Sequence, residues 1–422
     1  MLQNKRKILN DPIYGFINIP NHILFDLIEH PWFQRLRRIK QMGLSHLIYP
    51  GALHTRFHHS IGTMHLAVEA IQSLRMKGHT IPEEELTGLC IAMLLHDLGH
   101  GPYSHNLEGV LLPQINHEEI SLAGINHLNK LFGGALERAI AIYTGQYEKA
   151  WLNQLVSGQL DLDRLDYLRR DSFYTGVSEG TISVERILKM LNVTQGNLVI
   201  EEKGIYSIEK FIVARRLMYW QVYLHKTVLA AETMLANIIR RARELIKRGH
   251  QLDGSPLLLH FLTHSFTKEE FQNDPQTLAL FMQMDDVDIF ASIKLWQHNN
   301  DKILSYLSTS LVNRRLFRTL MKSTPFEHHT LEEINERVKK TFHIEEAEAT
   351  KYLVTSSEVF NSAYNPRSPK IRILEKDGTI EEITSLSEQM KVELLHTSML
   401  KHYLCFPKNI TMEKETFYEG VF

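Results

Sequence analysis

The sequence has few cysteines and no long apolar run. Only two of its 422 residues are cysteine, Cys90 and Cys405, and they lie far apart in apolar segments. This arrangement is unlike a disulfide framework, so we expect a reducing compartment. The densest apolar run, Cys90–Leu95, is far too short to cross a bilayer. Because the N-terminal segment MLQNKRKILNDPIYG also lacks the apolar core of a signal peptide, we expect a cytoplasmic protein with no membrane partner.

A strong net charge is also lacking. The chain has 47 Lys+Arg against 49 Asp+Glu, which gives a formal net charge of −2. No global positive field exists to attract nucleic acid by counterion release, which argues against a nucleic-acid partner. With 43% hydrophobic and 23% charged residues, the composition is that of an ordinary globular protein. It excludes wholesale disorder and low-complexity architectures.

The apolar periodicity predicts a mainly α fold, because apolar residues recur at spacings of three and four. The predicted helices are Ile61–Lys77, Glu83–Leu98, Glu118–Leu131, Gly134–Tyr143, Trp151–Tyr174 with a break near Gly158, Val184–Leu191 and Ser207–Arg248. Two hairpins are also predicted, one joining Asn197–Glu201 to Gly204–Tyr206 and one joining Lys370–Leu374 to Thr379–Ile383. No repeat and no linker rich in Pro, Gly or Ser is present. The composition changes near residue 250, and the segment from Glu358 to Phe422 mixes short strands and turns, so we expect a helical core with a small α+β appendage.

Histidine is abundant. The chain has 23 histidines, of which five lie from His96 to His127, with His54, His58 and His59 shortly before them. The segment LLHDLGHGPYSH ends an apolar helix with a His-Asp pair, where burial is costly unless a partner compensates the polar groups. A divalent cation is one such partner, since transition ions accept imidazole and carboxylate ligands together. A His-Asp pair also arises by chance in many chains, but here the abrupt Gly-Pro turn and further histidines follow it.

A second group of polar residues fills the segment DLDRLDYLRRD, from Asp161 to Asp171. At 3.6 residues per turn, Asp163, Tyr167 and Asp171 share one helical face. From the spacing alone, we predict a solvated charged face with i,i+4 pairs such as Asp166 with Arg170. A third stripe recurs about every four residues on the long helix, and it resembles the exposed edge of a core helix. Its members are Arg215, Tyr219, Tyr223 and Lys226.

The order His59, His96-Asp97, Asp163 resembles the H…HD…D signature of the HD superfamily of metal-dependent phosphohydrolases. The segments YPGALHTRFHHSIG, HDLGHGPYSH and DLDRLDYLRRD look like the deoxynucleoside triphosphate (dNTP) triphosphohydrolase branch, which includes the SAM-and-HD-domain enzyme and bacterial dGTPase-like proteins. The resemblance extends from about Lys7 to Lys226. It implies an HD phosphohydrolase core with an N-terminal regulatory segment over residues 1–250, and a C-terminal helical and α+β region over 251–422.

The same resemblance implies roles for individual residues. His59, His96, Asp97 and Asp163 would bind a divalent metal such as Fe, Mn or Mg. The implied catalytic residues are His105, supported by Glu108, together with the phosphate-binding His100 and His117. The implied substrate contacts are Gln41, Met42, Arg56, Arg164, Tyr167, Asp171, Arg215 and Tyr223. Arginine and metal suit a triphosphate, because arginine donates in a bidentate manner and a metal lowers the pKa of bound water. The implied reaction releases a deoxynucleoside and inorganic triphosphate.

The family also carries an allosteric nucleotide site between subunits. The matching residues here are Lys7, Asn10, Glu29, Gln34, Arg37, Arg186 and Lys203. The resemblance therefore implies a guanine nucleotide activator and a homo-oligomer, either a dimer or a tetramer. The chain departs from the family pattern in five places, which concern the acidic partner of the catalytic histidine, the pocket around the sugar and base, and the activator site. They are Glu29 and Glu108, each in place of Asp, Met42 in place of Leu, Leu224 in place of Gln, and Glu201 in place of a basic residue.

Two other functions are compatible with these patterns. The first is an HD phosphohydrolase that acts on nucleoside monophosphates or signalling nucleotides. The second is a nucleotide-sensing or nucleic-acid-binding module without turnover, which the basic runs Arg240-Arg241-Ala242-Arg243 and Asn313-Arg314-Arg315 would support. Because these runs are interspersed with apolar residues, we interpret them as solvated helix faces and subunit contacts. The complete predicted ligand set favours turnover.

Overall fold

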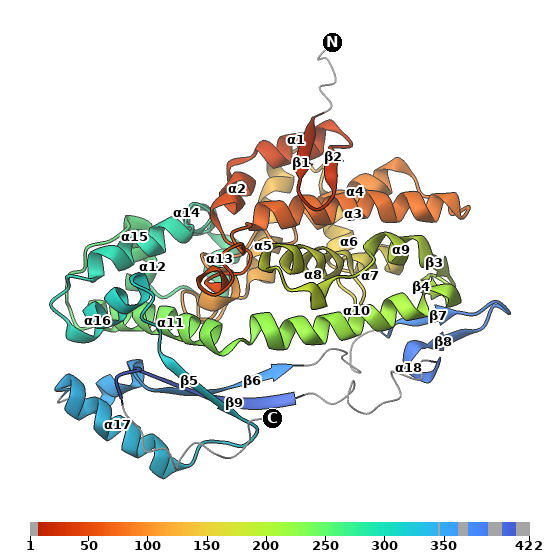
Figure 1. The fold of residues 1–422 in the computed structure, drawn as a ribbon. Helices are drawn as coiled ribbons and strands as arrows, with labels where there is room; N and C mark the ends of the chain where they lie inside the picture. The colour runs from red at the N-terminus through yellow and green to blue at the C-terminus, as the bar shows by residue number, and fades with distance from the viewer. Residues whose placement is uncertain (1–6, 345–346, 362–369, 387–398, 411–422) are drawn as a thin grey trace.

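The computed structural model describes residues 7–344, 347–361, 370–386 and 399–410. The described chain is mainly helical, as predicted, and carries small sheets at its periphery (Figure 1). Part of the C-terminal segment that we predict as short strands and turns falls outside the described residues. No helix in the described ranges has the length and apolar character needed to span a membrane.

Three helices form the centre of the first half of the chain: α3 (Arg56–Met76), α4 (Glu83–Leu95) and α8 (Leu162–Thr175). Helix α3 packs against both others. Helix α4 begins with three glutamates, which favour a helix N-terminus, and its second half is buried on all sides. The surrounding helices are α1 (His22–Glu29), α2 (Pro31–Gln34), α5 (His117–Leu131), α6 (Glu137–Tyr143), α7 (Ala150–Val156) and α9 (Val184–Met190).

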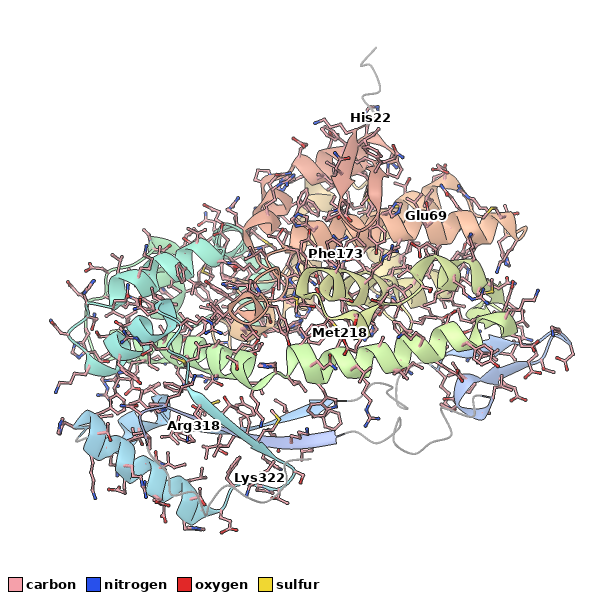
Figure 2. The ribbon with its side chains drawn as sticks, viewed as in Figure 1. His22, Glu69, Phe173, Met218, Arg318 and Lys322 are labelled. Atoms are coloured by element: carbon pink, nitrogen blue, oxygen red, sulfur yellow. The ribbon has the colours of Figure 1, made fainter. Side chains whose placement is uncertain are left out.

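The helix that we predict as continuous from Ser207 to Arg248 is interrupted. It consists of α10 (Ile205–Met218), a π-helical turn at Tyr219–Tyr223 and α11 (Lys226–Lys247). The extended backbone of His225 then separates the two parts. π-helical turns are frequent at functional sites, and this one presents Tyr223 to α8. In this view α10 and α11 run below α3, α4 and α8, and Met218, the last residue of α10, is buried (Figure 2).

The strands form three small sheets. The pair β1 (Ile8–Asp11) and β2 (Gly15–Asn18) is an antiparallel hairpin. The second sheet has the order β3-β4-β7-β8, and the third has the order β5-β9-β6. The remaining strand bounds are β3 Leu191–Thr194, β4 Asn197–Glu201, β5 Arg318–Lys322, β6 Thr355–Asn361, β7 Arg372–Leu374, β8 Ile380–Glu382 and β9 Met399–Phe406.

One predicted hairpin is wrong and the other is confirmed. Strand β4 pairs with the preceding β3, not with Gly204–Tyr206, which begins α10. The turn lies at Gln195-Gly196, where both residues have positive φ as a tight two-residue hairpin requires. The hairpin of β7 and β8 is antiparallel with Leu374 opposite Ile380, as predicted. The break in the predicted helix Trp151–Tyr174 is also wider than expected, because α7 ends at Val156 and α8 begins at Leu162.

The second half of the chain continues as short helices packed along α11 (Figure 1). Helices α15 and α16 pack against each other, and α16 packs on α11. The helices are α12 (Pro256–Thr263), α13 (Lys268–Asn273), α14 (Pro275–Phe281), α15 (Asp286–Trp296), α16 (Lys302–Val312), α17 (His328–Phe342) and α18 (Ile383–Leu386). Asp286, the first residue of α15, contacts Tyr103 in the loop after α4. The second half therefore reaches the same region as the histidine-rich segments.

Candidate metal centre and active site

The four predicted metal ligands come together between α3, α4 and α8. His59 lies in α3, His96 caps the end of α4, Asp97 follows it, and Asp163 lies in the first turn of α8. The His59 Nε2 atom is 3.0 Å from Asp163 Oδ1 and 3.6 Å from Asp97 Oδ2. The His96 Nε2 atom is 3.5 Å from Asp97 Oδ1 and 3.7 Å from Asp163 Oδ1.

The two imidazoles are oriented by hydrogen bonds on their other ring nitrogen. His59 Nδ1 lies 2.7 Å from the Asp166 carboxylate, and His96 Nδ1 lies 2.7 Å from the Met93 carbonyl oxygen. Both partners accept, so each Nδ1 carries a proton and each Nε2 is the ring nitrogen turned toward the carboxylates. Metal-ligating histidines are commonly fixed in this way.

The arrangement fits a cation. The Nε2 atoms of His59 and His96 are buried and make no hydrogen bond with acceptable geometry. Buried ring nitrogens that face two carboxylates are costly unless a positive charge, either a proton or a metal ion, lies among them. His59, His96 and Asp163 form a group whose ligand atoms lie within 4.8 Å of one another. Mixed imidazole and carboxylate donors suit Fe, Mn or a similar divalent ion, so this group and Asp97 could hold one.

The electrostatics of these side chains point the same way. Burial alone would lower the pKa of His59, but Asp163 and Asp166 raise it to about 10. Burial would raise the pKa of Asp97, but the Arg56 guanidinium and His96 hold it well below its usual range. The carboxylates are thus charged, and their field favours a positive charge on or between the imidazoles.

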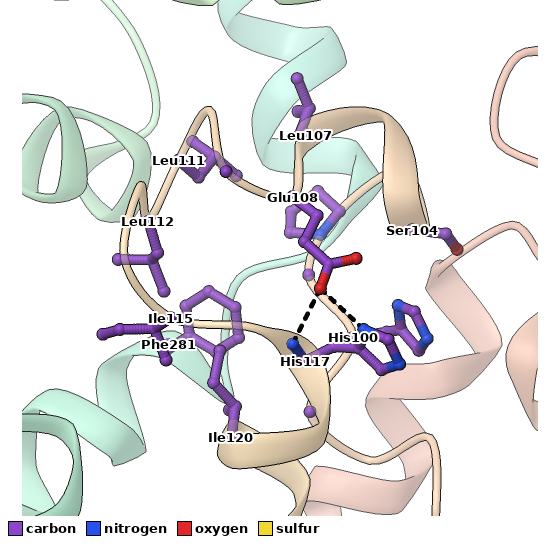
Figure 3. Close-up of a pocket in the computed structure, with 14 residues that line it drawn as sticks. His100, Ser104, Leu107, Glu108, Leu111, Leu112, Ile115, His117, Ile120 and Phe281 are labelled. Atoms are coloured by element: carbon purple, nitrogen blue, oxygen red, sulfur yellow. Dashed lines mark hydrogen bonds and ion pairs between the residues drawn. The ribbon is translucent and has the colours of Figure 1, made fainter. Parts of the chain in front are cut away.

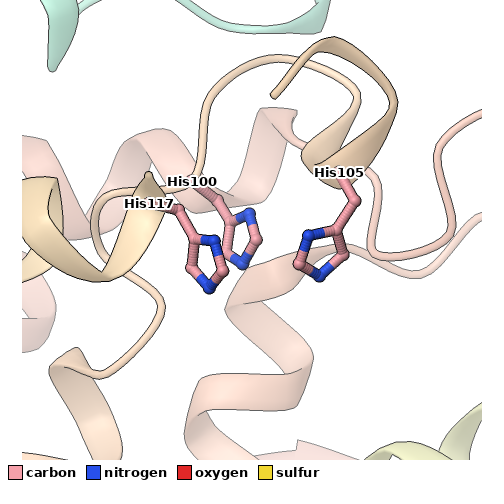
Figure 4. Close-up of side chains that lie close together, drawn as sticks. All are labelled: His100, His105 and His117. Carbon is pink, nitrogen blue, oxygen red and sulfur yellow. The ribbon is translucent and has the colours of Figure 1, made fainter. Parts of the chain in front are cut away.

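Three further histidines form a second group beside Asp97. His100, His105 and His117 have ligand atoms within 4.8 Å of one another (Figure 4). The His100 and His117 rings are stacked with centroids 3.8 Å apart. His100 Nε2 lies 3.3 Å from Asp97 Oδ1, so this group, which we call the histidine cluster, adjoins the candidate metal centre.

Glu108 holds two members of the histidine cluster. His105 Nδ1 lies 2.8 Å from one carboxylate oxygen, and His117 Nδ1 lies 2.8 Å from the other. The backbone N–H of His117 donates to the second oxygen as well (Figure 3). Burial would raise the pKa of Glu108, but these bonds from His105 and His117 hold it well below its usual range. The ionised Glu108 carboxylate therefore accepts three hydrogen bonds, which leaves the Nε2 atoms of His105 and His117 available.

The two faces of the histidine cluster differ in polarity. Apolar side chains cover one side of a small cavity behind the rings (Figure 3). They are Leu107, Leu111, Leu112, Ile115, Ile120 and Phe281. On the other side His105 is 65% exposed, so it can meet a molecule that arrives from solvent. Burial and the nearby Arg56 charge hold the pKa of His100 well below its usual range, which keeps this ring neutral.

Arg56 links the metal ligands to the loop after α4. It lies in the first turn of α3, is buried, and forms an ion pair with Asp97 through Nη1. Its Nε donates to the Ser104 hydroxyl at 2.9 Å. A buried guanidinium at this point supplies fixed positive charge next to the candidate metal centre.

Asp171 and Tyr223 are joined by a hydrogen bond between their side chains. The Tyr223 hydroxyl donates to Asp171 Oδ2 at 2.6 Å, and His54 Nε2 lies 2.7 Å from the other oxygen. The Tyr167 ring lies edge-on to Tyr223 with centroids 6.3 Å apart. The structure thus brings together these predicted substrate residues from α8 and the π-helical turn.

The other predicted substrate residues have varied surroundings. Arg164 donates to the Gly158 carbonyl at 2.6 Å and pairs with Asp161. Arg215 lies with its guanidinium 5.8 Å from the Tyr219 ring centre. Met42 is buried, and Gln41 has a buried Oε1 without a hydrogen-bond partner. An orphaned acceptor of this kind is available to a ligand.

The predicted regulatory residues form two groups. In the first, Lys7 lies 3.8 Å from Glu29, and the Arg37 Nε donates to Gln34 Oε1 at 2.8 Å. Asn10 lies apart on β1, opposite Phe16. In the second, Arg186 donates to the Lys203 carbonyl oxygen at 3.0 Å. No contact recorded among the described residues joins the two groups within one chain.

A polar network lies beneath His59 that the sequence pattern does not predict. Asp166 and Arg170, predicted as a solvated pair, are completely buried and joined by two hydrogen bonds of 2.8 and 2.9 Å. Arg170 Nη1 also donates to Asp11 of β1 at 2.7 Å. The solvated interpretation is wrong because the N-terminal hairpin covers this face of α8. The signal available in the sequence was the i,i+3 spacing from Asp163 to Asp166.

Two arginines of the basic run Arg240–Arg243 form contacts within the fold. Arg241 pairs with Asp301, with Nη2 to Oδ2 at 2.6 Å, and Arg243 donates to the Leu111 carbonyl at 2.8 Å. The solvated interpretation of this run is therefore wrong for these two arginines. Because their charges are engaged within the fold, they do not form a free basic surface for nucleic acid.

Two family models match the chain. The HD domain model matches residues 56–171, and the HD associated region model matches residues 182–253. The first match spans all the predicted metal ligands and the histidine cluster.

Individual relatives support the same family. The chain is 32% identical to an uncharacterised protein, YwfO of Bacillus subtilis, over 96% of this chain and 93% of the relative. It is 30% identical to the deoxynucleoside triphosphate triphosphohydrolase SAMHD1 homolog of Dictyostelium discoideum, over 64% of this chain and 56% of that protein. The chain thus spans only about half the length of that relative.

A solved structure matches nearly the whole chain. A phosphohydrolase from Bacteroides thetaiotaomicron has a TM-score of 0.92 and 48% sequence identity, covering 95% of this chain and 100% of that one. With the HD domain match and the relatives named as dNTP triphosphohydrolases, this chain belongs to the HD phosphohydrolase superfamily and is related to its dNTP triphosphohydrolase branch.

Proposed function

We propose that the protein hydrolyses deoxynucleoside triphosphates to a deoxynucleoside and inorganic triphosphate. The observation that carries this proposal is the position of Asp97. One of its oxygens faces His59 and the other faces His96 and His100, so the candidate metal centre and the histidine cluster share one carboxylate. A phosphate next to Asp97 would meet both groups at once.

A divalent metal bound by His59, His96, Asp97 and Asp163 would polarise the phosphate and lower the pKa of bound water. The chain's own residues would act around it. Arg56 provides fixed charge for a phosphate, since its guanidinium is held by Asp97 and Ser104. His105, whose Nδ1 proton is donated to Glu108, has a free Nε2 to accept or donate a proton near the scissile bond.

The hydrogen bond between Tyr223 and Asp171 supports a deoxyribose-binding role. The Tyr223 ring offers a surface on which a sugar can pack. The Asp171 carboxylate, which accepts a hydrogen bond from Tyr223, can also accept one from a sugar hydroxyl. A 2′-hydroxyl needs room and a partner, so a close-packed tyrosine at this point would favour 2′-deoxy substrates. We therefore assign Asp171 and Tyr223 to the sugar and His100, His117 and Arg56 to the phosphates.

Regulation by a guanine nucleotide and assembly into a homo-oligomer are part of the proposal. Lys7, Glu29, Gln34 and Arg37 offer two cations, a carboxylate and an amide at one face. This set can pair with phosphates and with the donor edge of guanine. The second group, Arg186 and Lys203, would complete the site from another subunit.

The test is product analysis. The purified protein is incubated with each dNTP or rNTP and Mn²⁺, and the products are separated by ion exchange and followed by phosphorus NMR. We expect triphosphate and deoxynucleoside from dNTPs, without diphosphate or monophosphate intermediates. Early orthophosphate or pyrophosphate, or equal rates with rNTPs, would instead favour an HD phosphohydrolase with another substrate.

A further inference from the structure

The loop that carries His105 contains a strained turn. Tyr103 and Ser104 both have left-handed backbone conformations, with φ of 56° and 55°. Such conformations are uncommon for residues other than glycine, and two in succession persist only where the surroundings hold them. The turn lies directly between His100 and His105, so its shape decides how these two rings are presented.

A carboxylate from the second half of the chain holds this turn. Asp286, the first residue of α15, is 3% exposed. Its Oδ1 accepts the backbone N–H of Tyr103 at 2.7 Å, and its Oδ2 accepts the backbone N–H of Lys40 at 3.0 Å. Lys40 precedes Gln41, one of the proposed substrate contacts. One buried side chain thus ties together two segments of the proposed active site.

Arg35, which is 1% exposed, binds the start of the same loop. Its Nε donates to the Met284 carbonyl at 2.6 Å, and its Nη2 donates to the His100 carbonyl at 2.8 Å. Ser104 closes the arrangement, because its hydroxyl donates to the Lys40 carbonyl at 2.9 Å while it accepts from Arg56 Nε.

We propose that Asp286 is a positioning residue for catalysis: through Tyr103 and Lys40 it holds the 100–105 loop in the conformation that aligns His105 and Arg56. The activity part of this proposal rests on the proposed function. It assigns a role to the C-terminal half, which otherwise contributes no proposed ligand or catalytic group. A buried carboxylate is costly unless its acceptors are used, and both oxygens of Asp286 are used by these two segments.

Asp286→Asn is the principal variant. Asparagine keeps the shape but replaces one acceptor oxygen with an NH₂ group, which cannot accept from Tyr103 and Lys40 together. Asp285→Asn is the matched control. Asp285 is the N-cap of α15 and pairs with the surface residue Arg38, and asparagine is an equally good N-cap.

Two measurements are made on the full chain with Mn²⁺. Amide hydrogen exchange over residues 99–108 is expected to accelerate in Asp286→Asn and to stay unchanged in Asp285→Asn. With dGTP, kcat is expected to fall at least about tenfold in Asp286→Asn, because misplaced catalytic groups slow the chemical step. The amount of bound Mn²⁺ is expected to be unchanged, since the candidate ligands lie on α3, on α8 and just after the end of α4.

A second variant guards against loss of folding. Ser104→Ala removes the hydroxyl that bonds to Lys40 and Arg56 from the same turn, and it changes the side-chain volume little. Because Ser104 and Asp286 act on one turn, the kcat losses of the double variant are expected to be less than the product of the single losses.

Unchanged exchange over residues 99–108 in Asp286→Asn would overturn the proposal, whether or not the wild type hydrolyses dGTP. Faster exchange with unchanged kcat would overturn it too, as would independent effects in the double variant. Absence of wild-type hydrolysis of every dNTP would refute the proposed function, while the exchange comparison would still decide whether Asp286 holds the loop.

Discussion

The His59 imidazole donates its Nδ1 proton to the Asp166 carboxylate across 2.7 Å, and both side chains are completely buried. This single bond fixes the tautomer that directs Nε2 toward Asp97 and Asp163. Asp166 is in turn held by Arg170, which reaches Asp11 on the N-terminal hairpin. The orientation of one candidate ligand therefore depends on a network that extends to the start of the described chain.

Replacing Asp166 by asparagine is expected to weaken metal binding. The amide keeps an acceptor but loses the charge that makes His59 a stronger donor to a cation, and such changes cost about 10–100-fold in affinity. The dissociation constant is measured by calorimetric titration of the metal-free protein with Mn²⁺. Asp11→Asn is the matched control, because it removes a carboxylate from the same arginine without touching His59. Equal affinities of the wild type and Asp166→Asn would contradict the role of this bond.

The sequence motifs led to the ligand set because HD, RFHHS and DLDRLDYLRRD are contiguous and carry their chemistry locally. The buried state of Asp166 and Arg170 was missed, since periodicity shows that two residues share a helix face but not what covers that face. The residue that pairs with Arg170 on this face is Asp11, which lies 159 positions from Arg170 in the sequence. The anchoring of the catalytic loop by Asp286 was missed for the same reason, because its partner Tyr103 is 183 positions away.

The main-chain errors have local causes. The segment Glu-Lys-Gly predicts a hairpin turn, but Gly196 supplies the positive φ that the hairpin uses. The interruption at Tyr219–Tyr223 leaves the apolar spacing nearly intact, so periodicity alone predicts one continuous helix. The two proposed domains, 1–250 and 251–422, stay a prediction.

Replacing His96 by alanine is expected to remove the metal and the activity together. Three remaining ligands rarely hold a labile divalent ion in dilute buffer, so elemental analysis should find less than stoichiometric metal. His79→Ala serves as a control, because His79 contacts Asn192 away from the candidate centre. Retention of stoichiometric metal in His96→Ala would show that the ligands are elsewhere.

Replacing Glu108 by glutamine is expected to separate catalysis from metal binding. An amide has one oxygen, so it cannot accept from both His105 and His117, and at least one ring loses its fixed tautomer. Loss of a positioned acid or base costs about 10²-fold or more in kcat. The metal content should equal that of the wild type. Glu118→Gln, an exposed neighbour on α5, should leave kcat unchanged. Full activity in Glu108→Gln would exclude the pairing from the mechanism.

The partly buried carboxyl of Glu232 on α11 is expected to make the free energy of unfolding depend on pH. Burial raises its pKa from the ordinary 4.5 to about 8. Between these values the folded chain binds more protons at this site than the unfolded chain, so the free energy of unfolding falls as pH rises. The slope is at most ~1.4 kcal/mol per pH unit. Urea unfolding at about pH 5 and about pH 8 should show a smaller pH-dependent loss for Glu232→Gln than for the wild type. Glu84→Gln, exposed on α4, controls for charge removal, and parallel losses in all three proteins would contradict the assignment.

The final prediction concerns the proposed regulatory site. Arg37 stacks over the Phe57 ring at 3.5 Å and donates to Gln34 Oε1, but it makes no recorded contact with the candidate metal ligands. If a nucleotide binds there between subunits, it shifts the protein toward the assembled state by its differential affinity. Arg37→Ala should then keep its metal, lose activity at low nucleotide concentration and assemble less in response to dGTP. Arg38→Ala is the matched control, because Arg38 pairs with Asp285 instead.

The competing explanation is a surface interaction worth at most about 1 kcal/mol, with no kinetic consequence. Rates over a range of dGTP concentrations, measured beside light scattering, distinguish the two. A sigmoidal wild-type curve that becomes shallower or shifts to higher concentration only in Arg37→Ala supports the regulatory site. A hyperbolic curve that is the same in all three proteins, with one oligomer size throughout, would refute it. That outcome would leave the catalytic proposal intact, because the ligands and the histidine cluster do not depend on Arg37.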